Sequence, residues 1–342
     1  MKCMNLYDVR RVDSGLSSKF ANASLIASLL VVTIHLPMPS HVGSVAWWCS
    51  ELVGGGLSTV AVPFFFLASG FFLMGHANED GWYSRALVAR LKTVLVPYFL
   101  WSIIAWVICS LHEGTDFDPV AVFGLNLRSW PPCLPVLWYL RALFLLVLLS
   151  PLIRQGERLG LWLIGLCFVS NQVGLALDGV FLWTFRLTGV AMFALGMYLR
   201  SHPFCVLCLN KQMLALFGIV GVSLVVTKTV MKRLDIPFVG TVEMLAIPLL
   251  LIVFWELVPE RKWPKALVSL SFPIYLLHMF ALALFKPVFK GLLDAGVGEE
   301  LARIALWAAA VALSGCFAFS LDFVFPSISS LLFGGRVHSK RG

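Results

Sequence analysis

Long apolar runs separated by short polar segments dominate the chain from residue 20 to residue 325. A helix needs about 20 consecutive, mostly apolar residues to cross a bilayer, and about ten runs approach that length. They lie at 20–36, 54–75, 93–111, 134–153, 159–177, 180–199, 212–231, 238–257, 267–289 and 301–325. The pattern predicts an all-α polytopic membrane protein with about ten transmembrane helices and no separate soluble domain within residues 1–342.

Composition agrees with this class. Hydrophobic residues make up 59% of the 342 residues and charged residues 13%, whereas a soluble domain carries roughly 25% charged residues. The net charge is +8, and Lys and Arg concentrate in alternate segments between the runs: 1–19, 77–92, 154–158, 200–212, 258–266 and 334–342. Basic loops stay in the cytoplasm, so we expect both termini there. The charge thus reflects membrane topology, and no nucleic-acid-binding motif is present.

Three basic residues break the charge pattern. Lys228, Lys232 and Arg233 would lie near the outer ends of the seventh and eighth runs. Either the helix boundaries differ from the predicted ones, or these charges serve a substrate.

His35 stands at the end of the first run, after Leu-Leu-Val-Val-Thr-Ile (29–34). An ionisable side chain in a membrane helix is costly and is a functional-site hypothesis by default. Imidazole takes and gives protons near neutral pH, which suits it to general base catalysis. The alternative is a helix-end histidine that contacts the lipid headgroups.

The second and third runs carry the next candidate residues. Ser69 and Gly70 are small, and small residues in membrane helices let a second helix or a ligand approach closely. Arg85, Arg90 and Lys92 follow at the predicted cytoplasmic edge. Such basic residues either mark topology and contact headgroups or bind phosphate, which the Arg fork matches.

Five segments in this order resemble the membrane-bound acyltransferase-3 family, over residues 20 to 330. They are His35 with the residues before it, Val-Pro-Phe-Phe-Phe-Leu-Ala-Ser-Gly-Phe (62–71), Arg90 with Pro97-Tyr98, Leu-Trp-Tyr-Leu-Arg (137–141) with Ser-Pro-Leu (150–152), and Ser-Leu-Ser-Phe-Pro-Ile-Tyr-Leu-Leu-His (269–278). Each segment alone is a weak signal, but five in register identify the chain as similar to this family.

The resemblance implies ten core helices in a bacterial inner membrane and transfer of an acyl group, usually acetyl, from cytoplasmic acyl-CoA. The acceptor it implies is a hydroxyl of a cell-surface carbohydrate or a lipid-linked glycan precursor. Two positions depart from the family pattern. Ser24 and Thr93 stand where the family often has a basic residue, and Arg10, Arg11, Lys19, Arg85 or Lys92 could supply the missing charges.

The expected mechanism follows from these residues. His35 would take the proton of the sugar hydroxyl as that oxygen attacks the thioester, or would carry the acyl group covalently. His278, which matches the second family histidine, is a candidate for orientation or acid–base chemistry. Arg85, Arg90 and Lys92 would hold the CoA phosphates, and Ser69 and Gly70 would let the pantetheine arm pass between helices.

Further polar and aromatic residues inside the runs are candidates for substrate binding. They are Arg141, Glu243, Tyr275 and Trp138. Instead of binding substrate, two of Arg141, Glu243 and Arg186 could form an ion pair that stabilises the fold. For His278, the alternative to a catalytic role is a hydrogen bond to a neighbouring helix.

A transporter is the alternative class of protein. About ten spans with scattered charges also suit a transporter of lipid-linked sugars or a small metabolite, although no inverted repeat and no paired broken helices are visible. We expect no metal site, because Cys205 and Cys208 form a lone C-x-x-C without a second pair or a His cluster. The sequence leaves the oligomeric state open.

Overall fold

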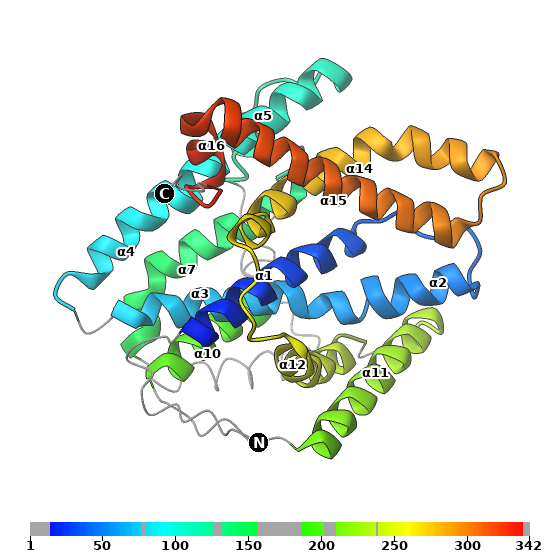
Figure 1. Ribbon diagram of the computed structural model, residues 1–342, viewed down its shortest axis with the longest axis horizontal. Coiled ribbons are helices and arrows are strands. Elements are labelled where there is room, and N and C mark those ends of the chain that lie inside the picture. Colours follow the sequence, from blue (N-terminus) through cyan, green and yellow to red (C-terminus); the bar gives the residue numbers. More distant parts are fainter. Residues whose placement is uncertain are drawn as a thin grey trace. The chain divides into compact units, whose positions relative to one another are not determined.

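The computed structural model describes residues 14–76, 79–125, 131–155, 187–201, 210–236 and 239–337. These residues form helices joined by turns, with no strand among them (Figure 1). Within these described ranges, eight helical segments are long and apolar enough to cross a membrane: Ser14–Ile34, Val45–Leu73, Trp82–Glu113, Pro135–Arg154, Lys211–Arg233, Val239–Leu257, Ser271–Asp294 and Glu299–Val324. The all-α polytopic class is therefore confirmed.

Eight of the ten predicted runs correspond to these segments, with ends that differ by up to eleven residues at the third. The fifth run, 159–177, lies outside the described residues, as does the beginning of the sixth. The remainder of the sixth run is α10 (Leu187–Ser201). The total of ten spans and the cytoplasmic position of both termini stay predictions.

The chain divides into two compact units. Two of the three boundaries fall inside the helices α3 (Ala61–Leu73) and α15 (Glu299–Val324), and the third lies outside the described residues. Unit 1 comprises residues 1–64 and 205–320, and unit 2 comprises residues 65–204 and 321–342. Each unit is described separately.

Unit 1 is built from the N-terminal helices and most of the C-terminal half. Its elements are α1 (Ser14–Ile34), α2 (Val45–Cys49), the π-helical η2 (Ser50–Gly54), the 3₁₀ segment η3 (Leu57–Val60), the start of α3 (Ala61–Leu73), α11 (Lys211–Arg233), α12 (Val239–Leu257), α13 (Lys265–Val268), α14 (Ser271–Asp294) and most of α15 (Glu299–Val324).

Small residues let α1 pack tightly in unit 1. Ala23, Ala27 and Ser28 are fully buried along its length, and α1 packs against α14. Helices α14 and α15 run side by side as an antiparallel pair (Figure 1), and the indole of Trp307 on α15 donates to the carbonyl of Leu29 at 3.1 Å. These contacts fix the end of α1, where His35 follows.

Unit 2 contains the middle of the chain and its C-terminal end. Its elements are the rest of α3, the 3₁₀ segment η4 (Met74–His76), α4 (Trp82–Arg90), the π-helical η5 (Leu91–Leu95), α5 (Val96–Glu113), α6 (Pro119–Val122), the 3₁₀ segment η6 (Pro135–Leu137), α7 (Trp138–Gln155), α10, the end of α15 and α16 (Pro326–Phe333).

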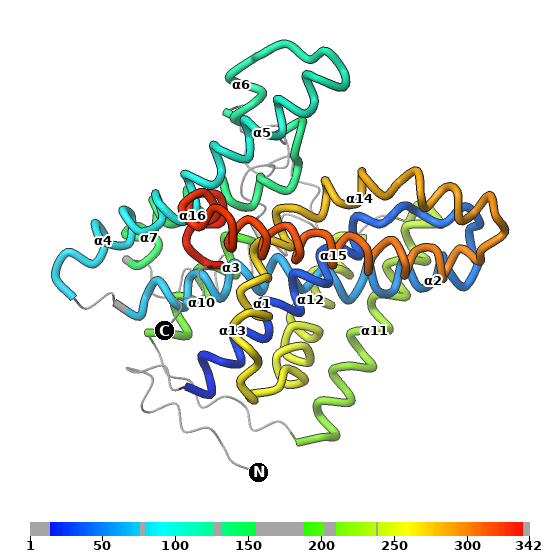
Figure 2. The backbone as a smooth tube through the Cα atoms, turned by 45° about the horizontal axis from the view of Figure 1, so that its top comes forward, coloured from blue at the N-terminus to red at the C-terminus, as the bar shows by residue number. Residues whose placement is uncertain are grey.

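Within unit 2, α4, η5 and α5 form one long helical segment beside α7 and α16 (Figure 2). The segment ends at Gly114, whose φ of +67° suits a glycine C-cap. Helix α16 begins with Pro326, which suits the first turn because its missing N–H has no helical partner there. The tryptophan of α5, Trp101, donates to the carbonyl of Leu332 on α16 at 3.0 Å.

Candidate functional site

His35 lies in the turn directly after α1, in unit 1. The Leu36-Pro37 pair stops the helix there, because proline disfavours the helical conformation of the residue before it. The backbone N–H of His35 still donates to the carbonyl of Val32 at 3.2 Å. The side chain is partly exposed, so the ring is held by the helix end while part of it stays accessible.

His278, on α14, faces His35. The two ring centroids are 5.1 Å apart, and His278 is fully buried. Its Nδ1 lies 3.1 Å from the carbonyl oxygen of Ile274. Because a carbonyl oxygen can only accept, Nδ1 carries the proton and Nε2 holds a free lone pair. Nε2 is buried and has no hydrogen-bond partner among the described residues.

Two hydroxyls connect the helices that carry these histidines. Ser28 and Ser271 hydrogen-bond each other at 2.8 Å, and Ser271 also donates to the carbonyl of Ser24 at 2.8 Å. Ser24, where the family often has a basic residue, thus takes part in this α1–α14 connection. The histidine pair was identified in the sequence, and the fold brings the two residues together although they are 243 positions apart.

Tyr275 lies one turn before His278 on α14 and is buried. Its ring centroid is 6.4 Å from that of His278 and 6.3 Å from that of Phe272, on which it stacks. Tyr275 therefore borders the histidine pair, as its spacing from His278 predicts.

The basic candidates lie in unit 2, and they do not all gather in one place. Arg90 ends α4 within electrostatic range of the Tyr139 hydroxyl, and the side chain of Ser69 hydrogen-bonds that hydroxyl. Lys92 is exposed. Arg85 is also exposed, and its guanidinium pairs with Glu79 at 2.7 Å.

Arg336 joins this group from the end of the chain, which the sequence assigned only to a basic terminal segment. Its Nη1 donates to the carbonyl of Thr93 at 2.9 Å, and its charge interacts with Arg90 and with Tyr139. Burial, with the charge of Arg90 as the second cause, lowers the pKa of Arg336 to about 10, so the group is charged at neutral pH. No sequence signal joins residues 93 and 336, because only tertiary packing brings them together.

Gly70 has a packing role in the structure. A Cβ at Gly70 would collide with the carbonyl oxygen of Phe193 on α10, and a Cβ at Gly196 on α10 would collide with the carbonyl oxygen of Leu67 on α3. The two glycines let the backbones of α3 and α10 meet. Helix α10 therefore packs directly against Gly70, and a passage for pantetheine beside this residue stays a prediction.

Arg141 and Trp138 lie at the start of α7, also in unit 2, and both are buried. The Nη1 of Arg141 donates to the carbonyl of Gly124, and the Tyr98 hydroxyl donates to the carbonyl of Phe123 at 2.6 Å. Trp138 packs its ring 6.1 Å from Phe66. Arg141 thus holds the turn at 123–124, and a substrate role for Arg141 and Trp138 stays a prediction.

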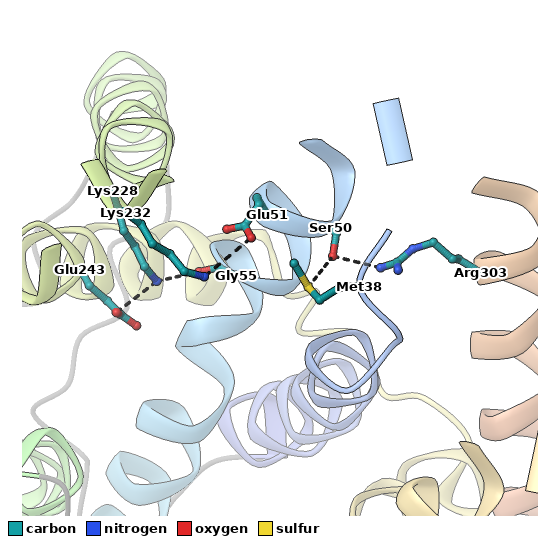
Figure 3. Close-up of polar contacts among 8 residues, drawn as sticks. All are labelled: Met38, Ser50, Glu51, Gly55, Lys228, Lys232, Glu243 and Arg303. Atoms are coloured by element: carbon teal, nitrogen blue, oxygen red, sulfur yellow. Dashed lines mark hydrogen bonds and ion pairs between the residues drawn. The ribbon is translucent and has the colours of Figure 1, made fainter. Parts of the chain in front are cut away.

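Glu243 forms an ion pair, although not with a predicted partner. Lys228 lies 3.1 Å from its carboxylate and donates to the carbonyl of Gly55 at 2.9 Å (Figure 3). Lys232 lies 3.9 Å from Glu51, and Arg233 lies over the ring of Trp47. Lys228, Lys232 and Arg233 thus have partners within the chain, whereas the sequence suggested either different helix boundaries or a role in substrate binding for them. Arg186, Cys205 and Cys208 lie outside the described residues.

The chemistry available at the histidine pair is proton transfer. A partly exposed imidazole beside a buried imidazole with a free lone pair can accept and return a proton. In unit 2, two guanidiniums supply positive charge and hydrogen-bond donors beside the hydroxyls of Tyr139 and Ser69, which suits an anion.

Comparison with known proteins gives two matches. The model of the acyltransferase-3 family, described as an acyltransferase domain, matches residues 25–323. The succinoglycan biosynthesis protein ExoH of Rhizobium meliloti (strain 1021) is 25% identical over 162 residues, which is 42% of this chain and 43% of that protein. The chain thus matches less than half the length of this relative. No solved structure matches the chain.

Proposed function

Since this chain belongs to the acyltransferase-3 family, we propose that it is an integral membrane O-acyltransferase. It moves an acyl group, most simply acetyl, from cytoplasmic acyl-CoA to a hydroxyl of a cell-surface carbohydrate or lipid-linked glycan precursor. The bacterial relative, a succinoglycan biosynthesis protein, supports a polysaccharide acceptor and a bacterial origin. The membrane in this proposal is the bacterial inner membrane. The observation that carries the proposal is the His35–His278 pair, which lies within the family-matched residues.

His35 acts as the general base in this proposal. It takes the hydroxyl proton while the hydroxyl oxygen attacks the thioester carbonyl, and a tetrahedral intermediate forms. When the intermediate collapses, the carbon–sulfur bond breaks and His35 returns the proton to the CoA thiolate. The partly exposed ring of His35 suits the residue that meets substrate, because His278 is fully buried.

His278 positions and assists His35. The hydrogen bond to Ile274 fixes its ring, so its Nε2 lone pair stays available to an N–H of His35 or to a substrate hydroxyl. Two imidazoles at this separation resist double protonation, because like charges repel strongly in a buried setting. The pair therefore holds at most one proton beyond neutrality and favours a free base.

The donor is bound by unit 2 in this proposal. The Arg90 guanidinium, beside the hydroxyls of Tyr139 and Ser69, offers hydrogen bonds to the phosphate oxygens of the donor. Arg85 and Lys92 are more exposed and attract the donor through their charge.

The experiment is acyl transfer by the purified protein in nanodiscs, with radiolabelled acetyl-CoA and membrane carbohydrate as acceptor. We compare the wild type with His35→Gln and with His41→Gln, a matched control at an exposed histidine of the following loop. We expect labelled carbohydrate with the wild type and the control, and a loss of about 10²- to 10⁴-fold with His35→Gln.

Two results would contradict parts of the proposal. Equal labelling by His35→Gln would remove His35 from the chemistry. A folded wild type that neither transfers label nor binds CoA would reject acyl transfer and favour transport of the glycan.

A further inference from the structure

The C-terminal segment after α16 is held in one place by packing and by backbone geometry. Phe333 is fully buried, and its ring lies 6.1 Å from Trp101 of α5. Gly334 and Gly335 follow with φ of +60° and +72°, a left-handed conformation that glycine adopts without strain. These two residues turn the chain so that Arg336 returns to the helical segment containing α4 and η5.

Gly334 lies against the backbone of Thr93. A Cβ at Gly334 would come to 2.5 Å from the Thr93 carbonyl oxygen, so only glycine fits at this approach. The same carbonyl accepts the hydrogen bond of 2.9 Å from Arg336 Nη1. Thr93 belongs to η5, a π-helical segment, and such segments occur frequently at functional sites.

Arg336 is thereby brought beside Arg90, which stands three residues before Thr93. The two guanidiniums repel each other, and both interact with the Tyr139 hydroxyl. The Ser69 side chain hydrogen-bonds the same tyrosine. Four side chains from α3, α4, α7 and the C-terminal segment therefore meet in unit 2, and two of them are cations.

We propose that Arg336 and Arg90 together bind a phosphate group, with the hydrogen-bonded Tyr139–Ser69 hydroxyl pair supplying one further donor, so that the C-terminal segment is part of an anion site. Each guanidinium can hold two phosphate oxygens in a bidentate geometry. An anion between them also relieves their mutual repulsion, whereas a single arginine would gain no such relief.

The identity of this phosphate rests on the function proposed above. An acyl-CoA donor carries a 3′-phosphate and a pyrophosphate, and a membrane also offers lipid headgroup phosphates. We assign the site to the donor, with Arg336 as a phosphate-binding residue. Arg336 lies beyond residue 323, where the family match ends, so this contribution comes from the structure of this chain.

The first measurement is calorimetric binding of adenosine 3′,5′-bisphosphate to the full chain in neutral phosphatidylcholine nanodiscs. We compare the wild type with Arg336→Gln, Arg336→Lys and Arg261→Gln. Arg261 is the matched control because it is an exposed arginine in unit 1 whose backbone carbonyl, and not its side chain, bonds Asn22. We expect Arg336→Gln to weaken binding about 10- to 100-fold, Arg336→Lys less, and Arg261→Gln by under about 2-fold.

A second measurement needs no variant and stands if Arg336→Gln fails to fold. Wild-type protein is labelled with the arginine reagent phenylglyoxal, and modification of Arg336 is quantified by mass spectrometry. We expect the bisphosphate to protect Arg336 and adenosine to leave it unprotected. Protection by phosphatidylglycerol nanodiscs, without protection by the bisphosphate, would overturn the donor assignment in favour of a lipid headgroup.

The outcomes separate this inference from the proposed function. If bisphosphate affinity is unchanged in a folded Arg336→Gln while acetyl transfer is intact, the site is wrong and the function stands. If Arg336 governs bisphosphate binding but no acyl transfer occurs, the site stands and the function is wrong. An equal loss of affinity in Arg261→Gln would show a general charge effect and would refute a defined site at Arg336.

Discussion

The close approach of α3 and α10 at Gly70 gives a stability prediction that also tests its sequence-based role. In Gly70→Ala, the new Cβ would collide with the Phe193 carbonyl oxygen, because it would lie much closer than the 3.4 Å at which ordinary contact begins. That oxygen belongs to helix backbone and cannot rotate away. The helices must therefore move apart by about 1 Å, and a gap of that size forfeits a quarter to a half of each dispersion contact it opens.

The expected cost follows from the buried residues along this contact. Phe193, Ala194, Met197 and Phe71 are buried at or beside the crossing, and overpacking such a site costs about 1–3 kcal/mol. Replacing a helical glycine by alanine returns up to about 1 kcal/mol. We expect a net destabilisation of about 1–2 kcal/mol, which lowers the ratio of folded to unfolded protein by roughly 5- to 30-fold.

The assay is reversible unfolding in mixed detergent micelles, followed by helical circular dichroism. Gly218→Ala on α11 is the control, because a Cβ there meets nothing within 4 Å, and its stability should be unchanged or slightly higher. Gly196→Ala should cost as much as Gly70→Ala. The double variant should cost less than the sum, because the helices have already separated.

CoA binding decides between the two roles of Gly70. If the residue serves packing, the folded fraction of Gly70→Ala binds CoA with little change in affinity. A variant as stable as the wild type that has lost CoA binding would refute the packing argument and support the pantetheine passage.

Three further predictions concern unit 1. Lys228→Met leaves the Glu243 carboxylate without its ion-pair partner and should destabilise the protein by about 1–3 kcal/mol in denaturation curves. The double variant with Glu243→Met should recover most of that stability, and a double variant no more stable than Lys228→Met would count against the pair. A double-mutant cycle on Ser28→Ala and Ser271→Ala should give a coupling energy of about 0.5–1.5 kcal/mol, and zero coupling would show that the hydroxyl pair does not hold α1 to α14. His278→Phe keeps a buried ring but removes Nε2, so kcat for acetyl transfer should fall at least about 10-fold in a protein that still melts cooperatively, whereas an unchanged kcat would leave His278 a structural residue.

Much of the histidine site was accessible from the sequence. A histidine at the end of an apolar run is costly in a membrane, which made His35 visible without any structure. Its position after Ile34 follows from the prolines that stop α1. His278 was identified by its segment, whereas its free Nε2 and its approach to His35 depend on how α1 packs against α14.

The basic residues of unit 2 could not be assigned to one site from the sequence. Arg85, Arg90 and Lys92 are close in sequence, yet Arg85 pairs with Glu79 and Lys92 is exposed. Local spacing cannot show which side chains share a site, since helical side chains point in different directions around the axis. Arg336 takes a place beside Arg90 from more than 240 residues away in the chain.

The sequence alone determined the membrane-spanning all-α class, because about 20 apolar residues per span are a requirement of the bilayer itself. It also determined the histidines, since an ionisable group among apolar residues stands out by composition. The tertiary structure alone decided the partners. Tertiary packing pairs Glu243 with Lys228, brings Gly70 against α10 and lets Arg336 hydrogen-bond the carbonyl of Thr93. Pairing depends on distances between segments remote in sequence, and packing of the folded helices fixes those distances.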